Sequence, residues 1–279
     1  FESGCGREFL KKCRNHSLSM ILKSNEGKKM TKCILCNREN KMCRSHVFPK
    51  WIFDYIKEND HSQKKGVILI DKQTNISEKS KGFRGNIGIC IECDRKIGDF
   101  DEFAKTFTTD DYIVRNGEEI NSYAGLIAYK LSFSKEQYNL LKKFVASLLL
   151  RASRARDVFS SAVDLGPFED DFIRYIAEGK ETDYLQVAIC KLVCPNASPA
   201  INNILIPFIR NKSSSGTMYQ FVINGIEFLA FVGKYVNRLS LCDFFIKEGE
   251  NYILISPWSD HINVSSIVDL LRPALASKR

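Results

Sequence analysis

The residues of this chain best suited to chemistry are four cysteines arranged in two C-x-x-C pairs. Cys33 and Cys36 form the first pair, and Cys90 and Cys93 form the second. A C-x-x-C turn places two thiolates on one side of a tight loop, and two such turns complete the tetrahedral sulfur shell that zinc prefers. The sequence therefore predicts one structural Zn²⁺ ion bound by these four residues.

Two other interpretations of the cysteines have less support. A thioredoxin-like motif needs one C-x-x-C at the end of a strand in a βαβ unit, and neither pair has that context. Alternatively, Cys43 and His46 complete a site with the first pair and leave the second pair unused. The chain has ten cysteines and no continuous apolar signal segment, so we expect a cytoplasmic protein with thiols and metal ligands instead of disulfides.

Between the pairs, a histidine stands in the sequence SHVFP. An imidazole titrates near neutral pH, which suits a general base that activates water. His46 could instead ligate zinc, or it could be a structural cap over the cysteine loop, held by a hydrogen bond to the backbone. All three roles remain possible from the sequence.

Short elements must position these residues. Residues 49–59 begin with proline and carry apolar side chains at helical spacing, which predicts an amphipathic helix. Residues 66–75 are typical of a strand and a turn, and residues 82–90 are glycine-rich and extended, leading into a helix that begins at residue 90 or 91. A cysteine knuckle, a hairpin region and a helix with the second pair in its first turn predict a treble-clef zinc module.

This arrangement resembles the zinc-bearing branch of the HNH, or His-Me finger, endonucleases. The likeness covers residues 33–97 and rests on CILC, on SHVFP, and on an asparagine four residues before CIEC. It implies an HNH-like ββα fold in which His46 is the general base, Asn86 orients the hairpin, and Asp94 stands where the family usually has its last metal-binding histidine. The catalytic ion would be Mg²⁺ or Mn²⁺, which stabilises charge on phosphate. Many members place an acidic residue or a histidine directly before the base, where this chain has Ser45.

A longer likeness joins SHVFPKWIF, ICIECDRKIGDFDEFAKTF and LLLRAS to a group of uncharacterised bacterial proteins, some of them labelled HNH-like. The resemblance implies a metal-dependent endonuclease (a hydrolase) that cleaves phosphodiester bonds in DNA or RNA, and phage defence is one setting for such an enzyme. The alternative is a non-catalytic, zinc-stabilised module that binds nucleic acid or protein.

Basic residues are concentrated at the start of the chain. The formal net charge is +8, and residues 1–50 alone have the same excess of lysine and arginine over glutamate, so the remainder is neutral. This distribution favours a polyanionic partner such as nucleic acid, although a solubilising tail explains it equally well. No apolar run approaches the roughly 20 residues of a membrane span, so we expect no membrane association.

The chain is interpreted as a basic N-terminal tail over residues 1–29, the zinc module over residues 30–110 and an α+β domain of unknown role over residues 111–279. In the last part, residues 134–159 predict a long helix that begins with a capping box. The basic end of this helix, with Arg151, is interpreted as solvent-exposed. Residues 168–179 predict another helix.

Four apolar segments near the C-terminus are separated by turn residues and predict an antiparallel sheet: NILIPFIR, MYQFVIN, IEFLAFVG and NYILIS. The dipeptide NG at residues 224–225 predicts a tight hairpin. A final helix is expected over residues 264–278.

Overall fold

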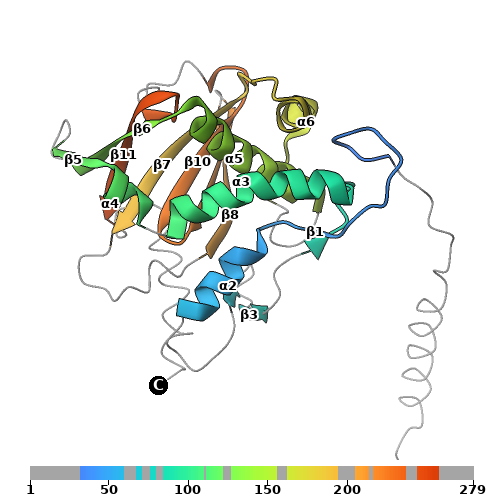
Figure 1. Cartoon of the computed structure of the whole chain (residues 1–279), viewed down its shortest axis with the longest axis horizontal. Helices are drawn as coiled ribbons and strands as arrows, with labels where there is room; N and C mark the ends of the chain where they lie inside the picture. Colours follow the sequence, from blue (N-terminus) through green and yellow to red (C-terminus); the bar gives the residue numbers. More distant parts are fainter. Residues whose placement is uncertain are drawn as a thin grey trace, which may run out of the picture.

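The computed structural model describes residues 32–59, 67–70, 76–79, 84–109, 111–121, 127–155, 162–193, 205–213, 216–236 and 244–257. The predicted basic tail and the predicted final helix lie outside the described residues. Figure 1 shows a mixed α+β protein in which helices cover one face of a large sheet, so the predicted class is confirmed. None of the helices that the structure describes combines the length and the apolar character that a membrane span needs.

The part that carries the cysteines is built from short elements: β1 (Ser45–His46), α2 (Lys50–Asn59), β2 (Val67–Ile70), β3 (Ile76–Lys79), β4 (Arg84–Gly85) and α3 (Ile91–Thr109). β1 pairs with β4 in antiparallel fashion, and β2 pairs with β3 in the same way. The predicted helices at residues 49–59 and 91 onward are confirmed. The order is therefore a cysteine loop, a two-stranded ladder with a hairpin inserted between its strands, and a helix.

The rest of the described chain contains α4 (Tyr112–Asn116), β5 (Glu118–Asn121), β6 (Ile127–Phe133), α5 (Lys135–Ala155), the 3-10 turn η2 (Gly166–Phe168), α6 (Glu169–Glu178), β7 (Leu185–Val193), β8 (Leu205–Ser213), β9 (Gly216–Ile223), β10 (Ile226–Val232) and β11 (Gly249–Pro257). Helix α5 packs against β6 and β7 of the large sheet, and α3 packs against α5. The four predicted strand segments and the helix over residues 168–179 are confirmed.

The large sheet has seven strands in the order β5-β6-β11-β7-β10-β9-β8. All neighbours are antiparallel except β11 and β7, which run parallel from Leu254 opposite Cys190, so the prediction of a purely antiparallel sheet is wrong at this pair. The reason is that β10 occupies one edge of β7, and β11 enters at the other edge antiparallel to β6. Strands β5 and β6 precede the long helix and were not identified from the sequence.

Helix α5 begins as predicted and extends at least to Ala155, and the last predicted residues, 156–159, lie outside the described residues. The Ser134 hydroxyl accepts the backbone N–H of Gln137 at 3.2 Å, and the Gln137 side chain accepts the backbone N–H of Ser134 at 2.9 Å. This reciprocal capping box satisfies two donors that a helix start otherwise leaves unpaired. The helix then buries Phe144 edge-on against Phe228 of β10, with ring centroids 6.1 Å apart.

One hydrophobic core runs through both halves of the chain. It includes Cys33 and Ile97 from the cysteine-bearing part and Ile253 from β11. Phe48, which follows β1, stacks on Phe208 of β8 with ring centroids 5.0 Å apart. The cysteine-bearing part is therefore packed directly on the α5-and-sheet part across the predicted boundary at residue 110.

Candidate metal centre and the adjoining hairpin

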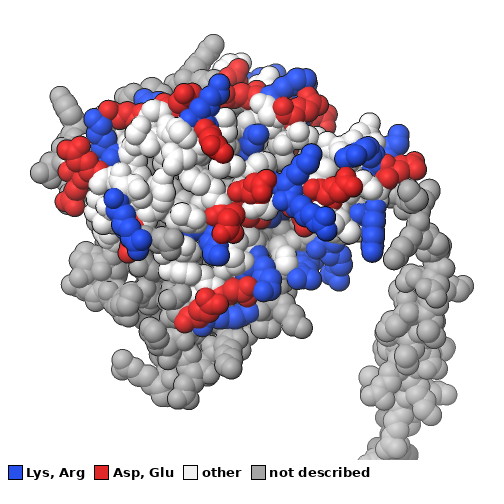
Figure 2. Space-filling view, in the orientation of Figure 1, with Lys and Arg blue, Asp and Glu red and all other residues white. Residues whose placement is uncertain are grey.

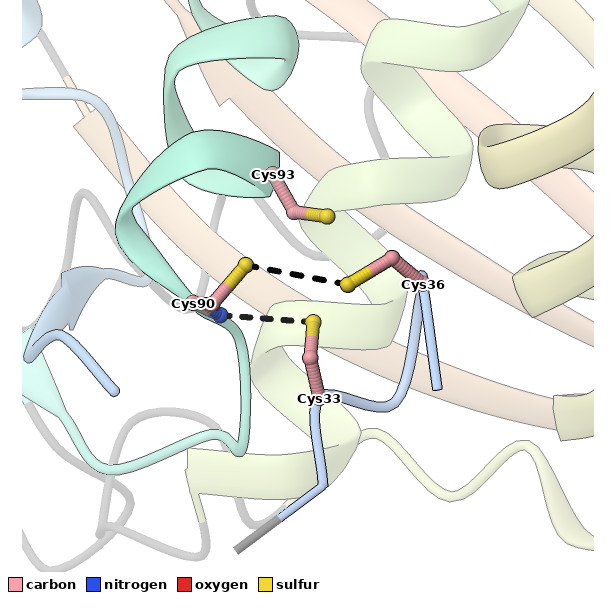
Figure 3. A group of neighbouring side chains, drawn as sticks. All are labelled: Cys33, Cys36, Cys90 and Cys93. Carbon is pink, nitrogen blue, oxygen red and sulfur yellow. Dashed lines mark hydrogen bonds between the residues drawn. The ribbon is translucent and has the colours of Figure 1, made fainter. Parts of the chain in front are cut away.

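The four predicted ligand cysteines lie together. Their sulfur atoms are all within 4.8 Å of one another, and Figure 3 shows them pointing toward a common centre from the loop before β1 and from the start of α3. Tetrahedral zinc with Zn–S bonds of ~2.3 Å has sulfurs about 3.8 Å apart, and the Cys36 and Cys90 sulfurs are 3.8 Å apart. The predicted cluster is confirmed as a group that could bind a metal such as zinc.

The cysteine loop is folded by its own backbone. The N–H of Asn37 donates to the carbonyl of Cys33 at 2.8 Å, and Asn37 has a φ of 55°, a left-handed conformation that asparagine tolerates. The loop docks on the segment before α3, where the N–H of Ile34 donates to the carbonyl of Gly88 at 3.0 Å. Gly88 has a φ of 78°, which favours glycine.

The surroundings shift the pKa values of the cysteine thiols in opposite directions. The pKa of the Cys36 thiol is lowered to about 6, chiefly because the backbone N–H of Arg38 donates to its sulfur. Burial raises the pKa of the Cys90 and Cys93 thiols. A divalent cation stabilises thiolates outright, so metal binding would remove the cost of ionising the two buried thiols.

The alternative ligand set, in which Cys43 and His46 join Cys33 and Cys36, does not form a cluster in the structure. The Cys43 thiol donates to the carbonyl of Ile89 at 3.3 Å, and the ring of His46 bonds to Arg84. Among the described residues, the one group of three or more potential ligands is the set of four cysteines.

Ser45 and Asp94 meet beside this centre. The Ser45 side chain is buried and its hydroxyl donates to Oδ1 of Asp94 in the first turn of α3. These are the two positions at which the HNH resemblance implies ligands of a divalent ion. The structure therefore places an alcohol and one carboxylate at that point.

His46 lies on the exposed side of the same ladder. Its Nε2 accepts a hydrogen bond from Nε of Arg84 at 2.8 Å, so the ring proton of a neutral imidazole is on Nδ1. Arg44 and Arg84 are both exposed, and Arg44 donates to the carbonyl of Arg84 at 3.4 Å. Successive side chains of a strand point to opposite faces, so the ring of His46 and the carboxylate of Asp94 occupy different faces of β1.

Asn86, the third residue of the predicted catalytic set, is exposed and directly follows β4. It therefore lies next to the two-stranded ladder that contains His46, in which β4 pairs Arg84 with His46. The hydrogen bonds of the described residues do not join the predicted catalytic residues: His46 bonds to Arg84, and Asp94 bonds to Ser45.

Arg151 is the residue that sequence reasoning placed wrongly. Its side chain is only 2% exposed, and each of its five N–H groups has an acceptor. The acceptors are Ser147 O (3.2 Å), Ser147 Oγ (3.1 Å), His46 O (3.3 Å) and the two carboxylate oxygens of Asp101 (2.8 and 3.1 Å). A bidentate pair with Asp101 explains the burial of the guanidinium.

The helical period itself contained the signal for this burial. Arg151 lies seven residues after Phe144 and three after Leu148, which is the spacing of the buried stripe of α5. Burial raises the pKa of Asp101, and the adjacent Arg151 opposes that shift. Through its bonds to the carbonyl of His46 and to the carboxylate of Asp101, the side chain of Arg151 links α5 to β1 and to the middle of α3.

No protein-family model, no curated protein and no solved structure matches this chain. The fold and the metal centre are therefore interpreted from this chain's own residues.

Proposed function

We propose that residues 33–109 form a treble-clef zinc module of the HNH type, and that the protein is a metal-dependent endonuclease acting on nucleic acid. The order of elements supports the proposal: a cysteine loop, β1 with His46, β4, and α3 opened by the second cysteine pair. The zinc ion would be structural, since four cysteines leave no open coordination position for a substrate.

The observation that carries the proposal is the pairing of His46 with Arg84. The imidazole of His46 and the exposed guanidinium of Arg84 belong to one short ladder, and the exposed Arg44 directly precedes it and donates to the carbonyl of Arg84. Neither arginine has a carboxylate partner among the described residues. Guanidinium binds phosphate in bidentate fashion, so a phosphodiester would draw Arg84 from Nε2 and expose the lone pair of a general base to an attacking water.

The residues at the ion position fit Mg²⁺ or Mn²⁺. Mg²⁺ keeps several waters and is often held by one or two carboxylates together with substrate phosphate, and Asp94 supplies one carboxylate beside the Ser45 hydroxyl. The bound ion would stabilise charge on the leaving oxygen. In an in-line displacement the attacking and the leaving oxygen lie on opposite sides of the phosphorus. His46 would act on the attacking water and Asp94 on the ion at the leaving oxygen, so the two residues need not contact the same ion.

A second candidate function is a non-catalytic module that binds nucleic acid or a protein. The bond from Ser45 to Asp94 favours it, because the carboxylate that the ion needs is already engaged by a buried hydroxyl. On the face shown in Figure 2, lysine and arginine are interspersed with aspartate and glutamate and do not form one continuous basic surface. If the protein is such a binding module, Arg44 and Arg84 would make the contacts to the partner.

The test is a cleavage assay on mixed single- and double-stranded DNA and RNA with Mg²⁺ or Mn²⁺. Asp94→Ala should slow cleavage, and a higher ion concentration should restore part of the rate, because mass action compensates for weaker ion binding. Arg115→Ala, which removes an exposed arginine from α4, should leave the rate unchanged. Wild-type protein that binds nucleic acid but cleaves none of these substrates with either ion would favour the second candidate.

A further inference from the structure

The four cysteines of the metal centre are not equally shielded from solvent. Cys33, Cys90 and Cys93 are buried, at 1%, 1% and 5% exposure. Cys36 is half-buried, and its thiol group is at the protein surface. The Cys33 sulfur, by contrast, accepts the backbone N–H of Cys90 at 3.3 Å, as Figure 3 shows. A small reagent in solution therefore reaches the cluster first at Cys36.

Metal binding gives the exposed residue a defined chemical form. A cysteine ligates a divalent metal as the thiolate, so Cys36 is ionised whenever the centre is occupied. The thiolate is also the form that attacks peroxides, and the first product of that reaction is a sulfenic acid. Exposure and ionisation thus coincide at one of the four sulfurs.

A second sulfur stands within reach of the first. The Cys36 and Cys90 sulfurs are 3.8 Å apart and face each other in Figure 3. Sulfurs in a disulfide are about 2.0 Å apart, so a local shift of the cysteine loop is enough to join them. A sulfenic acid beside a thiol condenses to a disulfide, and Cys90 is therefore placed to resolve an oxidised Cys36.

Cys43 provides a comparison within the same module. It is half-buried, as Cys36 is, but it is not part of the four-cysteine cluster. Its thiol donates to the carbonyl of Ile89 at 3.3 Å, so it is protonated in the structure. A free cysteine is only a few per cent thiolate near pH 7. The two residues thus have similar exposure and different expected reactivity.

We propose that Cys36 is a site of oxidative modification by hydrogen peroxide and that Cys90 resolves it as a disulfide. The Cys36 thiolate attacks one peroxide oxygen, the O–O bond breaks, and hydroxide leaves. The Cys90 thiolate then attacks the Cys36 sulfur, the S–O bond breaks, and a second hydroxide leaves. The two sulfurs lose two electrons, peroxide gains them, and two protons from solvent convert both hydroxides to water.

The disulfide removes two of the four ligands, so zinc should dissociate as the bond forms, because structural sites need all four. This inference rests on the zinc centre of the proposed function and not on catalysis by His46. Nuclease activity therefore has no bearing on its test.

The experiment treats the zinc-loaded full chain with hydrogen peroxide near pH 7, after its zinc content has been measured. A colorimetric indicator follows zinc release, and peptide mass spectrometry with dimedone locates sulfenic acid and disulfides. Cys36 should be modified about ten-fold faster than Cys43. Zinc release should accompany the disulfide between Cys36 and Cys90, and a thiol reductant with added zinc should reverse both changes. A chain that holds no zinc before peroxide is added would overturn the metal centre and this proposal together.

Two variants sharpen the result. Cys36→His should retain zinc, because three cysteines and one histidine also form structural sites, and it should release zinc about ten-fold more slowly in peroxide. Cys43→Ser should release zinc as the wild type does. Equal modification of Cys36 and Cys43, a disulfide that joins Cys36 to Cys43 or Cys33 instead of Cys90, or unchanged release from Cys36→His would overturn the proposal. Peptide mapping of the wild type decides the matter alone if Cys36→His does not bind zinc.

Discussion

The cysteine cluster and the His46 ladder are neighbours, yet different interactions hold them. The cluster is made by two short segments whose sulfurs converge and whose backbones bond to each other. The ladder has only two residues in each strand, and Arg151 of α5 holds its main chain from outside. The stability of the cysteine cluster should therefore depend on a bound metal, whereas the stability of the ladder should depend on tertiary packing.

The largest effect should come from the cluster. The pair of changes Cys90→Ser and Cys93→Ser should abolish zinc binding and unfold the cysteine loop, because structural zinc supplies apparent binding free energies of about 10–16 kcal/mol in small zinc peptides. Zinc content per chain, measured by elemental analysis, checks this prediction. Cys43→Ser is the matched control, since its half-buried thiol donates to the carbonyl of Ile89 and is not part of the four-cysteine cluster, and it should retain one zinc. Loss of zinc in Cys43→Ser would revive the rival ligand set.

The two regions also differ in how far the sequence predicted them. Ligand spacing in C-x-x-C is a local property, so the sequence alone identified all four cysteines of the cluster. Partners of the ladder are not local: Arg84 reaches His46 across an inserted hairpin, and Arg151 reaches its carbonyl from a distant helix. No spacing rule encodes such contacts.

The same distinction applies to the fold. The strands from β8 to β11 were predicted because apolar runs and turn residues are local signals. The parallel pairing of β11 with β7 depends on which sheet edge stays open after β10 has paired. Local patterns carry no information about that choice.

The next largest effect should follow loss of Arg151. Arg151→Ala should destabilise the fold by about 3 kcal/mol, because it leaves the carboxylate of Asp101, whose side chain is 16% exposed, without its partner. Denaturant unfolding of the zinc-loaded protein measures the change. The double change Arg151→Met and Asp101→Leu removes both charges and should cost clearly less than Arg151→Ala. Equal costs would mean that the pair does not hold the ladder.

A smaller effect is expected at Ser45. Ser45→Asp places a second carboxylate beside Asp94, so the free energy of unfolding should fall without added ions because like charges are buried together. Mg²⁺ or Mn²⁺ should restore the melting temperature of this variant more than that of the wild type. Ser45→Ala, which adds no charge, should show no such ion dependence. An ion response of the same size in both variants would argue against a divalent site here.

The smallest effect should be that of Arg84→Ala on stability, since the side chain is exposed. Its effect should appear in nucleic-acid binding, where one lost phosphate contact lowers the slope of log K against log salt by about 1. Arg115→Ala is again the control and should leave the slope unchanged. Identical slopes for the two variants would remove Arg84 from the proposed interface.

The most direct test of the central claim is the cleavage rate of His46→Ala, determined on protein whose zinc content and melting temperature are known. A general base contributes about 10²- to 10⁴-fold, so cleavage should fall by that factor while zinc stays bound and the fold stays stable. A variant that cleaves as fast as the wild type, or one that loses zinc together with activity, would contradict the assignment of His46 as the base beside an independent zinc centre.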